Sequence, residues 1–98
     1  MAKGYWINFY RSVSNPAALA EYAKLAGPAI EAGGGRFLAR GTPARTFEAG
    51  LNQRSVVIEF DSVEKAIATY ESPAYQAAVK HLEGAVERDV RILEGISS

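Results

Sequence analysis

The segment "GYWINFYRSV", residues 4–13, limits the architectures that this sequence can adopt. It is rich in aromatic and β-branched residues and short for a helix, so it predicts a β-strand. Alternate side chains of a strand face opposite sides. Both sides are largely apolar here, with Tyr5, Ile7 and Phe9 on one and Trp6, Asn8 and Tyr10 on the other. A strand that is apolar on both sides needs cover on both sides.

A helix is predicted directly after this strand. Asn15 is a good N-cap and Pro16 suits the first helical position. Apolar residues then recur at helical spacing as far as Ile30. Because Pro28 cannot donate a backbone hydrogen bond to residue 24, we expect a kink or a break at Gly27 and Pro28.

Three consecutive glycines, residues 33–35, come after this helix. A phosphate-binding glycine loop follows a strand and opens a helix, whereas this triplet closes a helix and leads into a strand. We therefore expect it to end the helix with a residue at positive φ, and we do not expect it to bind phosphate.

The next segments predict two strands and a helix. Residues 36–40 and 54–60 are typical of strands joined by a long connection, in which residues 46–48 are a candidate continuation of the ladder. Asp61 and Glu64 form a capping-box pattern at the start of the helix.

A further helical segment and a strand complete the chain. Ser72 is the predicted N-cap and Pro73 the first helical residue, with an apolar stripe from Tyr75 to Val86. Residues 89–95 predict the last strand. The order β-α-β-β-α-β predicts an α+β, ferredoxin-like fold with a four-stranded antiparallel sheet and helices on one face. We expect a single domain over residues 1–98.

Composition excludes several classes of protein. Eleven Lys and Arg residues balance eleven Asp and Glu residues, so no net charge attracts nucleic acid or an anionic membrane. There is no cysteine and one histidine, and nothing clusters carboxylates at metal spacing, so we expect no metal site. No apolar run approaches the ~20 residues that span a bilayer. With no secretion signal in sight, we expect a cytoplasmic protein that does not contact membranes.

The RNA-recognition motif shares this order of elements, and its third strand carries a basic residue, a glycine and spaced aromatic residues for base stacking. The segment "RSVVIEF" offers Arg54, but valines and an isoleucine stand where the rings are needed. We therefore expect no nucleic-acid partner.

Several stretches together resemble the domain-of-unknown-function 1330 family. They are "AKGYWI", "GGRFLARG", "VVIEF" followed by "DSVEKAIATYESPAYQ", and the closing "LEG", and they span nearly the whole chain. The resemblance implies a subunit of the dimeric α+β barrel type, in which two sheets pack face to face. The wider superfamily includes cofactor-free monooxygenases of antibiotic biosynthesis, so no cofactor is implied. The family itself carries no assigned reaction, and the resemblance implies no particular function.

One position departs from the family's pattern. Members often carry an arginine about one turn after the "SPAYQ"-like motif, where this chain has Leu82 beside His81. If that arginine holds a ligand in other members, the contact is lost or moved here.

The residues also predict a homodimer, because helices can cover only one face of the sheet. We assign the parity of Tyr5, Ile7 and Phe9 to the helix side. The other face would then expose Trp6, Asn8, Tyr10, Val57 and Leu93. A patch of this kind usually marks an interface, so we expect two copies to pair through it.

Two titratable groups are candidate catalytic residues for proton transfer. His81 is the only side chain whose unperturbed pKa lies near neutrality, and it is either a flanking, exposed histidine or a group that faces a cleft. Glu59 lies within an apolar strand, where a carboxylate must pair or face water. Arg40 is its first candidate partner, with Arg36 or Arg91 as substitutes. Such a pair is either an interface ion pair or the polar floor of a pocket.

The candidate ligand-binding residues are Asn8, Tyr10, Arg40, Tyr70 and Tyr75. Asn8 and Tyr10 share one face of the first strand, Arg40 is the expected partner of Glu59, and Tyr70 and Tyr75 flank the break between the helical segments at Ser72 and Pro73. The alternative for the aromatic members is packing in the core or in an interface.

Two functions remain open at this point. The first is a cytoplasmic homodimer that binds a small apolar or aromatic molecule between sheet and helices, with a cofactor-independent enzymatic version that uses His81 and Glu59. The second is a non-catalytic module for dimerisation or partner binding.

Overall fold

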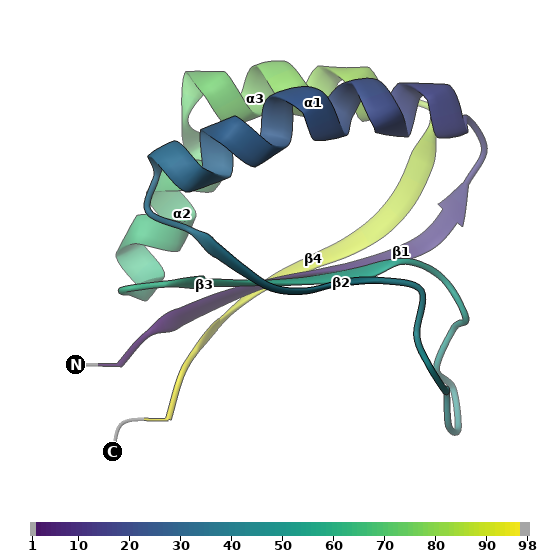
Figure 1. Ribbon diagram of the computed structural model, residues 1–98, viewed down its shortest axis with the longest axis horizontal. Helices are drawn as coiled ribbons and strands as arrows, with labels where there is room; N and C mark the ends of the chain where they lie inside the picture. Colours follow the sequence, from purple (N-terminus) through teal and green to yellow (C-terminus); the bar gives the residue numbers. More distant parts are fainter. Residues whose placement is uncertain (1, 97–98) are drawn as a thin grey trace.

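The structure is a computed structural model and describes residues 2–96. It has two layers, a four-stranded antiparallel sheet and three α-helices on one face of it (Figure 1). In chain order the elements are β1 (Gly4–Val13), α1 (Pro16–Ala32), β2 (Arg36–Gly41), β3 (Ser55–Phe60), α2 (Val63–Glu71), α3 (Pro73–Val79), the 3-10 helix η1 (Lys80–Leu82) and β4 (Val86–Glu94). The predicted α+β, ferredoxin-like fold class is confirmed.

The strand order is β2-β3-β1-β4, so β1 is a central strand with antiparallel neighbours on both sides. Trp6 lies opposite Ile58 of β3 and Ile92 of β4, whereas Tyr5 lies opposite Glu59 and Leu93. Residues opposite one another in an antiparallel pair share a face. The two faces of the sheet are therefore defined by Trp6 and by Tyr5.

The face that carries Trp6 is the one that the helices cover. Trp6, Phe60, Ile58, Ile30 and Tyr75 are the largest fully buried side chains. The Trp6 ring stacks on the Phe60 ring, with 6.1 Å between the ring centres. It meets the rings of Tyr70 and Tyr75 edge-on, with centre-to-centre distances of 5.3 and 4.7 Å. Through these contacts Tyr70 of α2 and Tyr75 of α3 pack against the central strand β1.

The predicted orientation of β1 is wrong, because its other parity faces the helices. Phe9 is 41% exposed and Tyr5 and Ile7 are half-buried, while Trp6, Asn8 and Tyr10 are buried. The orientation of β3 and the outward position of Leu93 were predicted correctly. The helix-free face therefore carries Tyr5, Ile7, Phe9, Val57 and Leu93, and Trp6, Asn8 and Tyr10 cannot belong to an interface there.

Helix α1 begins as predicted but does not break. The Asn15 side chain accepts a hydrogen bond from the Ala18 amide at 3.2 Å, with Pro16 as the first helical residue. The helix then continues through Pro28 to Ala32. Pro28 and Lys24 are both exposed, so water can hydrogen-bond to the carbonyl that loses its helical donor.

The glycine triplet ends α1 as predicted. Gly34 has φ +94°, in the left-handed region that favours glycine. The amides of Gly34 and Gly35 donate to the carbonyls of Glu31 and Ile30, which satisfies the last turn of the helix. The chain then enters β2.

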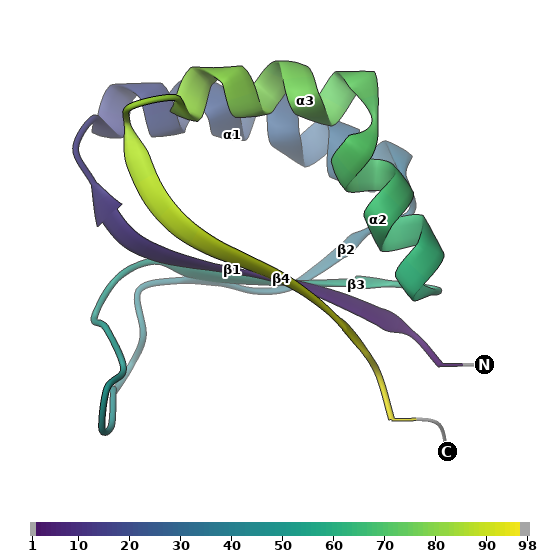
Figure 2. The same cartoon turned by 180° about the vertical axis from the view of Figure 1, so that it is seen from behind.

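Three predicted boundaries are wrong. Ser62, not Asp61, caps α2, since its hydroxyl accepts from the Lys65 amide at 3.2 Å. Residues 46–48 lie outside the strands, in the connection between β2 and β3, which projects from the sheet on the side opposite the helices (Figure 2). Val86 begins β4 instead of ending the helical stripe.

Among residues 2–96, no helix combines the length and the apolar character that crossing a membrane requires.

Candidate functional site

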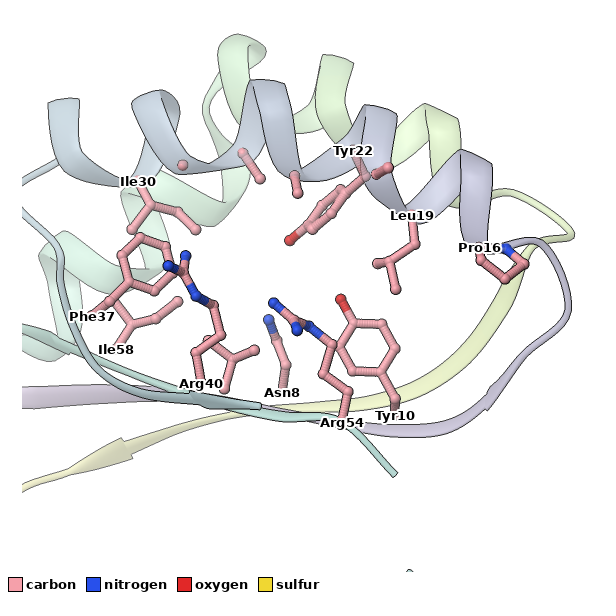
Figure 3. Close-up of a pocket in the computed structure, with 15 residues that line it drawn as sticks. Asn8, Tyr10, Pro16, Leu19, Tyr22, Ile30, Phe37, Arg40, Arg54 and Ile58 are labelled. Carbon is pink, nitrogen blue, oxygen red and sulfur yellow. The ribbon is translucent and has the colours of Figure 1, made fainter. Parts of the chain in front are cut away.

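A cavity of about 260 Å³ lies between α1 and the sheet (Figure 3). The sheet supplies its floor through β1, β2 and β3, and α1 supplies its roof from Pro16 to Ile30. The roof contains four small residues, Ala20, Ala23, Ala26 and Gly27. Short side chains at these positions leave space that larger residues would fill. The cavity is therefore a consequence of the small-residue pattern of α1.

Asn8 is the buried polar residue at the centre of the floor, 2% exposed. The Trp6 indole nitrogen donates to the Asn8 Oδ1 atom at 2.6 Å. Because an indole N–H can only donate, this bond fixes the orientation of the amide. The Asn8 NH₂ group is left to face the cavity (Figure 3).

Two arginines extend into the same space. Arg40 is opposite Val56, and Val56 is opposite Asn8, so the three side chains form one row across the helix-facing side of the sheet. Arg54 precedes β3 and also lines the cavity. Figure 3 shows both guanidinium groups pointing into the cavity beside Asn8.

A β-bulge places Arg40 in the cavity. The register of β2 shifts between Phe37 and Ala39, which leaves Leu38 unpaired. Regular alternation would put Arg36 and Arg40 on the same face. With one extra residue between them, Arg36 lies on the helix-free face and Arg40 on the cavity side. The Arg40 guanidinium lies 4.9 Å from the centre of the Phe37 ring.

A cluster of hydroxyl groups closes the side of the cavity at Tyr22. The hydroxyl oxygens of Tyr22 and Tyr75 are 2.6 Å apart. Arg88 of β4 donates to both of them, at 3.2 Å to Tyr22 and 2.9 Å to Tyr75. Its guanidinium also lies 5.1 Å from the centre of the Tyr22 ring. The cluster joins α1, α3 and β4 through hydrogen bonds.

Burial sets the ionisation of the hydroxyl groups here. It raises the pKa of Tyr75 well above its usual value, and the neighbouring Tyr22 raises this pKa further. Burial also raises the pKa of Tyr10, whose side chain lines the cavity. A tyrosine hydroxyl with its ordinary pKa is already protonated at neutral pH, and these shifts extend the protonated form to more alkaline pH.

The structure brings three of the five predicted ligand-binding residues together. Asn8, Tyr10 and Arg40 line the cavity. Tyr70 and Tyr75 do not line it, and their rings pack against Trp6. For Tyr70 the structure favours the packing alternative, and Tyr75 reaches the site only through its bond to Tyr22.

Neither of the two candidate proton-transfer residues lines this cavity, and they lie on opposite sides of the sheet. Glu59 lies on the helix-free face, where it accepts from the Tyr5 hydroxyl at 3.0 Å and pairs with Arg36 at 3.1 Å. The expected partner Arg40 is wrong, and the substitute Arg36 is correct. The hydrogen bond from Tyr5, followed by that from Arg36, lowers the pKa of Glu59 despite its partial desolvation. His81 is exposed in η1 on the helix side of the sheet.

Sequence reasoning did not identify Tyr22, Arg54 and Arg88 as site residues. Tyr22 was assigned only to the apolar stripe of α1. Arg54 is two residues before Val56, so alternation along β3 places it with Asn8 once the orientation of β1 is known. Arg88 lies opposite Tyr10 in the register of β4. For the two arginines the signal was present, but it depended on strand pairing.

Within the part of the chain that the structure describes, no group of three or more His, Asp or Glu side chains could hold a metal ion.

A family model described as "Domain of unknown function (DUF1330)" matches residues 3–96. No curated protein matches the chain. Among solved structures, the RPA0582 protein of unknown function from Rhodopseudomonas palustris is 22% identical with a TM-score of 0.74, and the match covers 99% of this chain and 85% of that one.

Two further solved structures share the fold at lower identity. A dimeric ferredoxin-like protein of unknown function from Thermobifida fusca is 17% identical with a TM-score of 0.66, covering 95% of this chain and 91% of that one. SnoaB, a cofactor-independent oxygenase from Streptomyces nogalater, is 10% identical with a TM-score of 0.63, and the match covers 100% of this chain and 97% of that one. At these identities the likeness shows a common fold and does not transfer an activity.

Proposed function

The chain belongs to the DUF1330 family, and we propose that it binds a small, largely apolar or aromatic molecule in the cavity between α1 and the sheet. The observation that carries the proposal is the composition of this cavity. Its wall is mostly aliphatic and aromatic, with a few polar groups that converge on one region. Small-molecule sites are usually built in this way.

The volume of the cavity limits the ligand. It is about 260 Å³, slightly below the ~300–1,000 Å³ of sites for drug-sized molecules. A ligand with one ring or a short aliphatic chain fits this space. Larger substrates would have to extend past the exposed side of Arg40.

A cavity-filling substitution tests the proposal. Ala23→Leu places a larger side chain in the roof of the cavity, and Ala17→Leu makes the same change at an exposed position of α1 that does not line it. We expect small aromatic compounds to shift the NMR amide signals of Asn8 and Tyr22 in the wild type and in Ala17→Leu, but not in Ala23→Leu. Equal shifts in both variants, or none in the wild type, would refute binding at this site.

We further propose that two copies pair through the helix-free face of the sheet. Phe9 and Leu93 on that face are 41% and 51% exposed, and Ile7 and Val57 are half-buried beside them. The Thermobifida fusca protein, which shares the fold, is described as dimeric. Burying an apolar strip of this kind against a second copy is favourable.

The dimer is tested by introducing a charge into the strip. Leu93→Asp should give a monomer in size-exclusion chromatography with light scattering. Leu25→Asp, which changes a leucine of similar exposure on the helix layer, should remain a dimer. A wild-type protein that is monomeric at micromolar concentration would end this proposal.

Catalysis enters only by analogy with the cofactor-independent oxygenase that shares the fold. The cavity contains neither Glu59 nor His81, so the enzymatic version with these residues stays a prediction. Its test is a turnover assay of Glu59→Ala and His81→Ala, once a reaction is known. The alternative, a non-catalytic module for dimerisation or partner binding, is favoured if the dimer forms and no small molecule binds.

A further inference from the structure

We infer that the ligand of this cavity is an anion, a small carboxylate with an apolar or aromatic body, held by Arg40, Arg54 and the hydroxyl of Tyr22. This inference rests on the proposed small-molecule function and names its ligand class. It follows from counting the hydrogen-bond donors and acceptors that face the cavity.

The first step concerns Asn8, which could present either a donor or an acceptor. The Trp6 indole N–H occupies its Oδ1 atom at 2.6 Å. Rotating the amide by 180° would place two donors against each other. The group that faces the cavity is therefore NH₂, a donor.

The second step concerns Tyr22, whose hydroxyl could also play either role. Tyr75 is fully buried, and among the described residues its hydroxyl forms hydrogen bonds only with Tyr22 and Arg88. Arg88 can donate but not accept, so the proton of Tyr75 must be donated to the Tyr22 oxygen. That oxygen also accepts from Arg88 at 3.2 Å. The proton of Tyr22 is then free for an acceptor in the cavity, toward which its hydroxyl points (Figure 3).

The third step concerns the charge. Arg40 and Arg54 both line the cavity, and no acidic residue lines it. Within residues 2–96, no carboxylate lies within salt-bridge distance of either guanidinium. Three arginines elsewhere in the sheet, Arg11, Arg36 and Arg91, are each paired with an acidic residue. Two unpaired cations in one cavity favour a ligand that supplies the negative charge.

The cavity therefore presents hydrogen-bond donors and positive charge to its ligand. A carboxylate has two acceptor oxygens and suits the planar guanidinium group. The apolar part of the ligand has a separate place, since Ile30, Phe37 and Ile58 gather at one end of the cavity, beyond Arg40 (Figure 3).

The test compares phenylacetate with phenylacetamide, its neutral counterpart, by isothermal titration calorimetry and by NMR of the amide signals. We expect phenylacetate to bind about tenfold more tightly or better, because hydrogen bonds to a charged group are the stronger kind. The shifted signals should belong to Asn8, Tyr22, Arg40 and Arg54.

Variants connect the preference to particular side chains. Arg40→Gln and Arg54→Gln should each weaken phenylacetate binding by about tenfold and leave phenylacetamide unchanged. Arg45→Gln is the matched control, since Arg45 is exposed and does not line the cavity. Tyr22→Phe removes only a hydroxyl and should weaken the binding of phenylacetate by about fivefold. Circular dichroism of each variant verifies that it is folded.

The outcomes separate this inference from the proposed function. Phenylacetamide could bind as tightly as phenylacetate, with the arginine variants changing the affinity for neither compound. In that case the ligand is neutral, and only the anion inference is overturned. If neither compound binds at millimolar concentration, or if both shift signals only outside the cavity, the anion inference and the proposed function both fail.

Discussion

The hydroxyl oxygens of Tyr22 and Tyr75 lie 2.6 Å apart, one at the wall of the cavity and the other fully buried behind it. Arg88 donates to both. The pair therefore joins a core residue of α3 to the wall of the cavity, and the proton that Tyr75 donates determines the hydrogen-bonding role of the Tyr22 hydroxyl.

The first prediction concerns the stability that this pair provides. Tyr75→Phe removes the buried hydroxyl and one of the two acceptors of Arg88, so it should lower the free energy of unfolding by about 1–3 kcal/mol in urea denaturation. Tyr70→Phe is the control, because the described residues offer its hydroxyl no hydrogen-bond partner, and it should change stability by less than about 0.5 kcal/mol. Equal effects of the two substitutions would contradict the role of the pair.

The second prediction concerns the start of α1. Asn15→Ala removes the side-chain acceptor for the Ala18 amide and should cost about 1 kcal/mol of stability. Asn15→Asp retains an acceptor at the same place and should restore most of this loss. If Asn15→Asp is as unstable as Asn15→Ala in chemical denaturation, the side-chain cap does not stabilise the helix.

The third prediction concerns the acid dependence of stability. Hydrogen bonds from Tyr5 and Arg36 lower the pKa of Glu59, and Arg36 lowers that of Asp61. A carboxyl group whose pKa is lower in the folded state contributes stability above its unfolded pKa, and loses it as the pH falls through the folded pKa. The unfolded values are 4.5 and 3.8. Stability should therefore decline as the pH falls below about 5.

The matched variants for this titration are Arg36→Gln and Arg45→Gln. Arg36→Gln removes the shared partner of both carboxylates, so thermal unfolding temperatures between pH 3 and pH 7 should depend less on pH. Arg45→Gln should follow the wild-type curve. A wild-type slope in Arg36→Gln would show that these carboxylates do not produce the acid dependence.

The fourth prediction concerns the space beside the glycine triplet. A Cβ atom at Gly35 would lie 2.6 Å from Ile30 Cγ2 and 2.7 Å from Phe60 Cζ, closer than real contacts allow. Gly35→Ala should therefore lower the free energy of unfolding by about 1–3 kcal/mol. At Gly27 a Cβ would meet nothing within 4 Å, so Gly27→Ala should change stability by less than about 1 kcal/mol. If Gly35→Ala leaves the free energy of unfolding unchanged, the start of β2 can shift to accommodate the added methyl group.

The sequence predicted the elements better than their pairing. Local signals located β1, the capped start of α1, the end of α1 at the glycines and the start of α3 at Ser72 and Pro73, because each depends on residues that are close in the chain. The orientation of β1 depends on strands β3 and β4, which are far away in sequence. Counting apolar residues favoured the face of Ile7 and Phe9, but Trp6 and its bond to Asn8 occupy the core.

The site was predicted in part for the same reason. Asn8 was recognised as an amide among aromatic residues, whereas Arg40 was selected only as the expected partner of Glu59. The bulge at Leu38 moves Arg40 to the opposite face, and nothing in "RFLARG" shows that one residue is skipped in the ladder. Arg54 and Arg88 enter the site only through the strand register.

The bond between Trp6 and Asn8 has a practical consequence. Trp6 is the only tryptophan of the chain and is 0% exposed, and its indole nitrogen is bonded to the residue at the centre of the cavity floor. A ligand that engages the Asn8 amide changes the electric field at the indole. The protein thus carries an intrinsic fluorophore beside this cavity, and unlabelled compounds can be screened by following tryptophan emission.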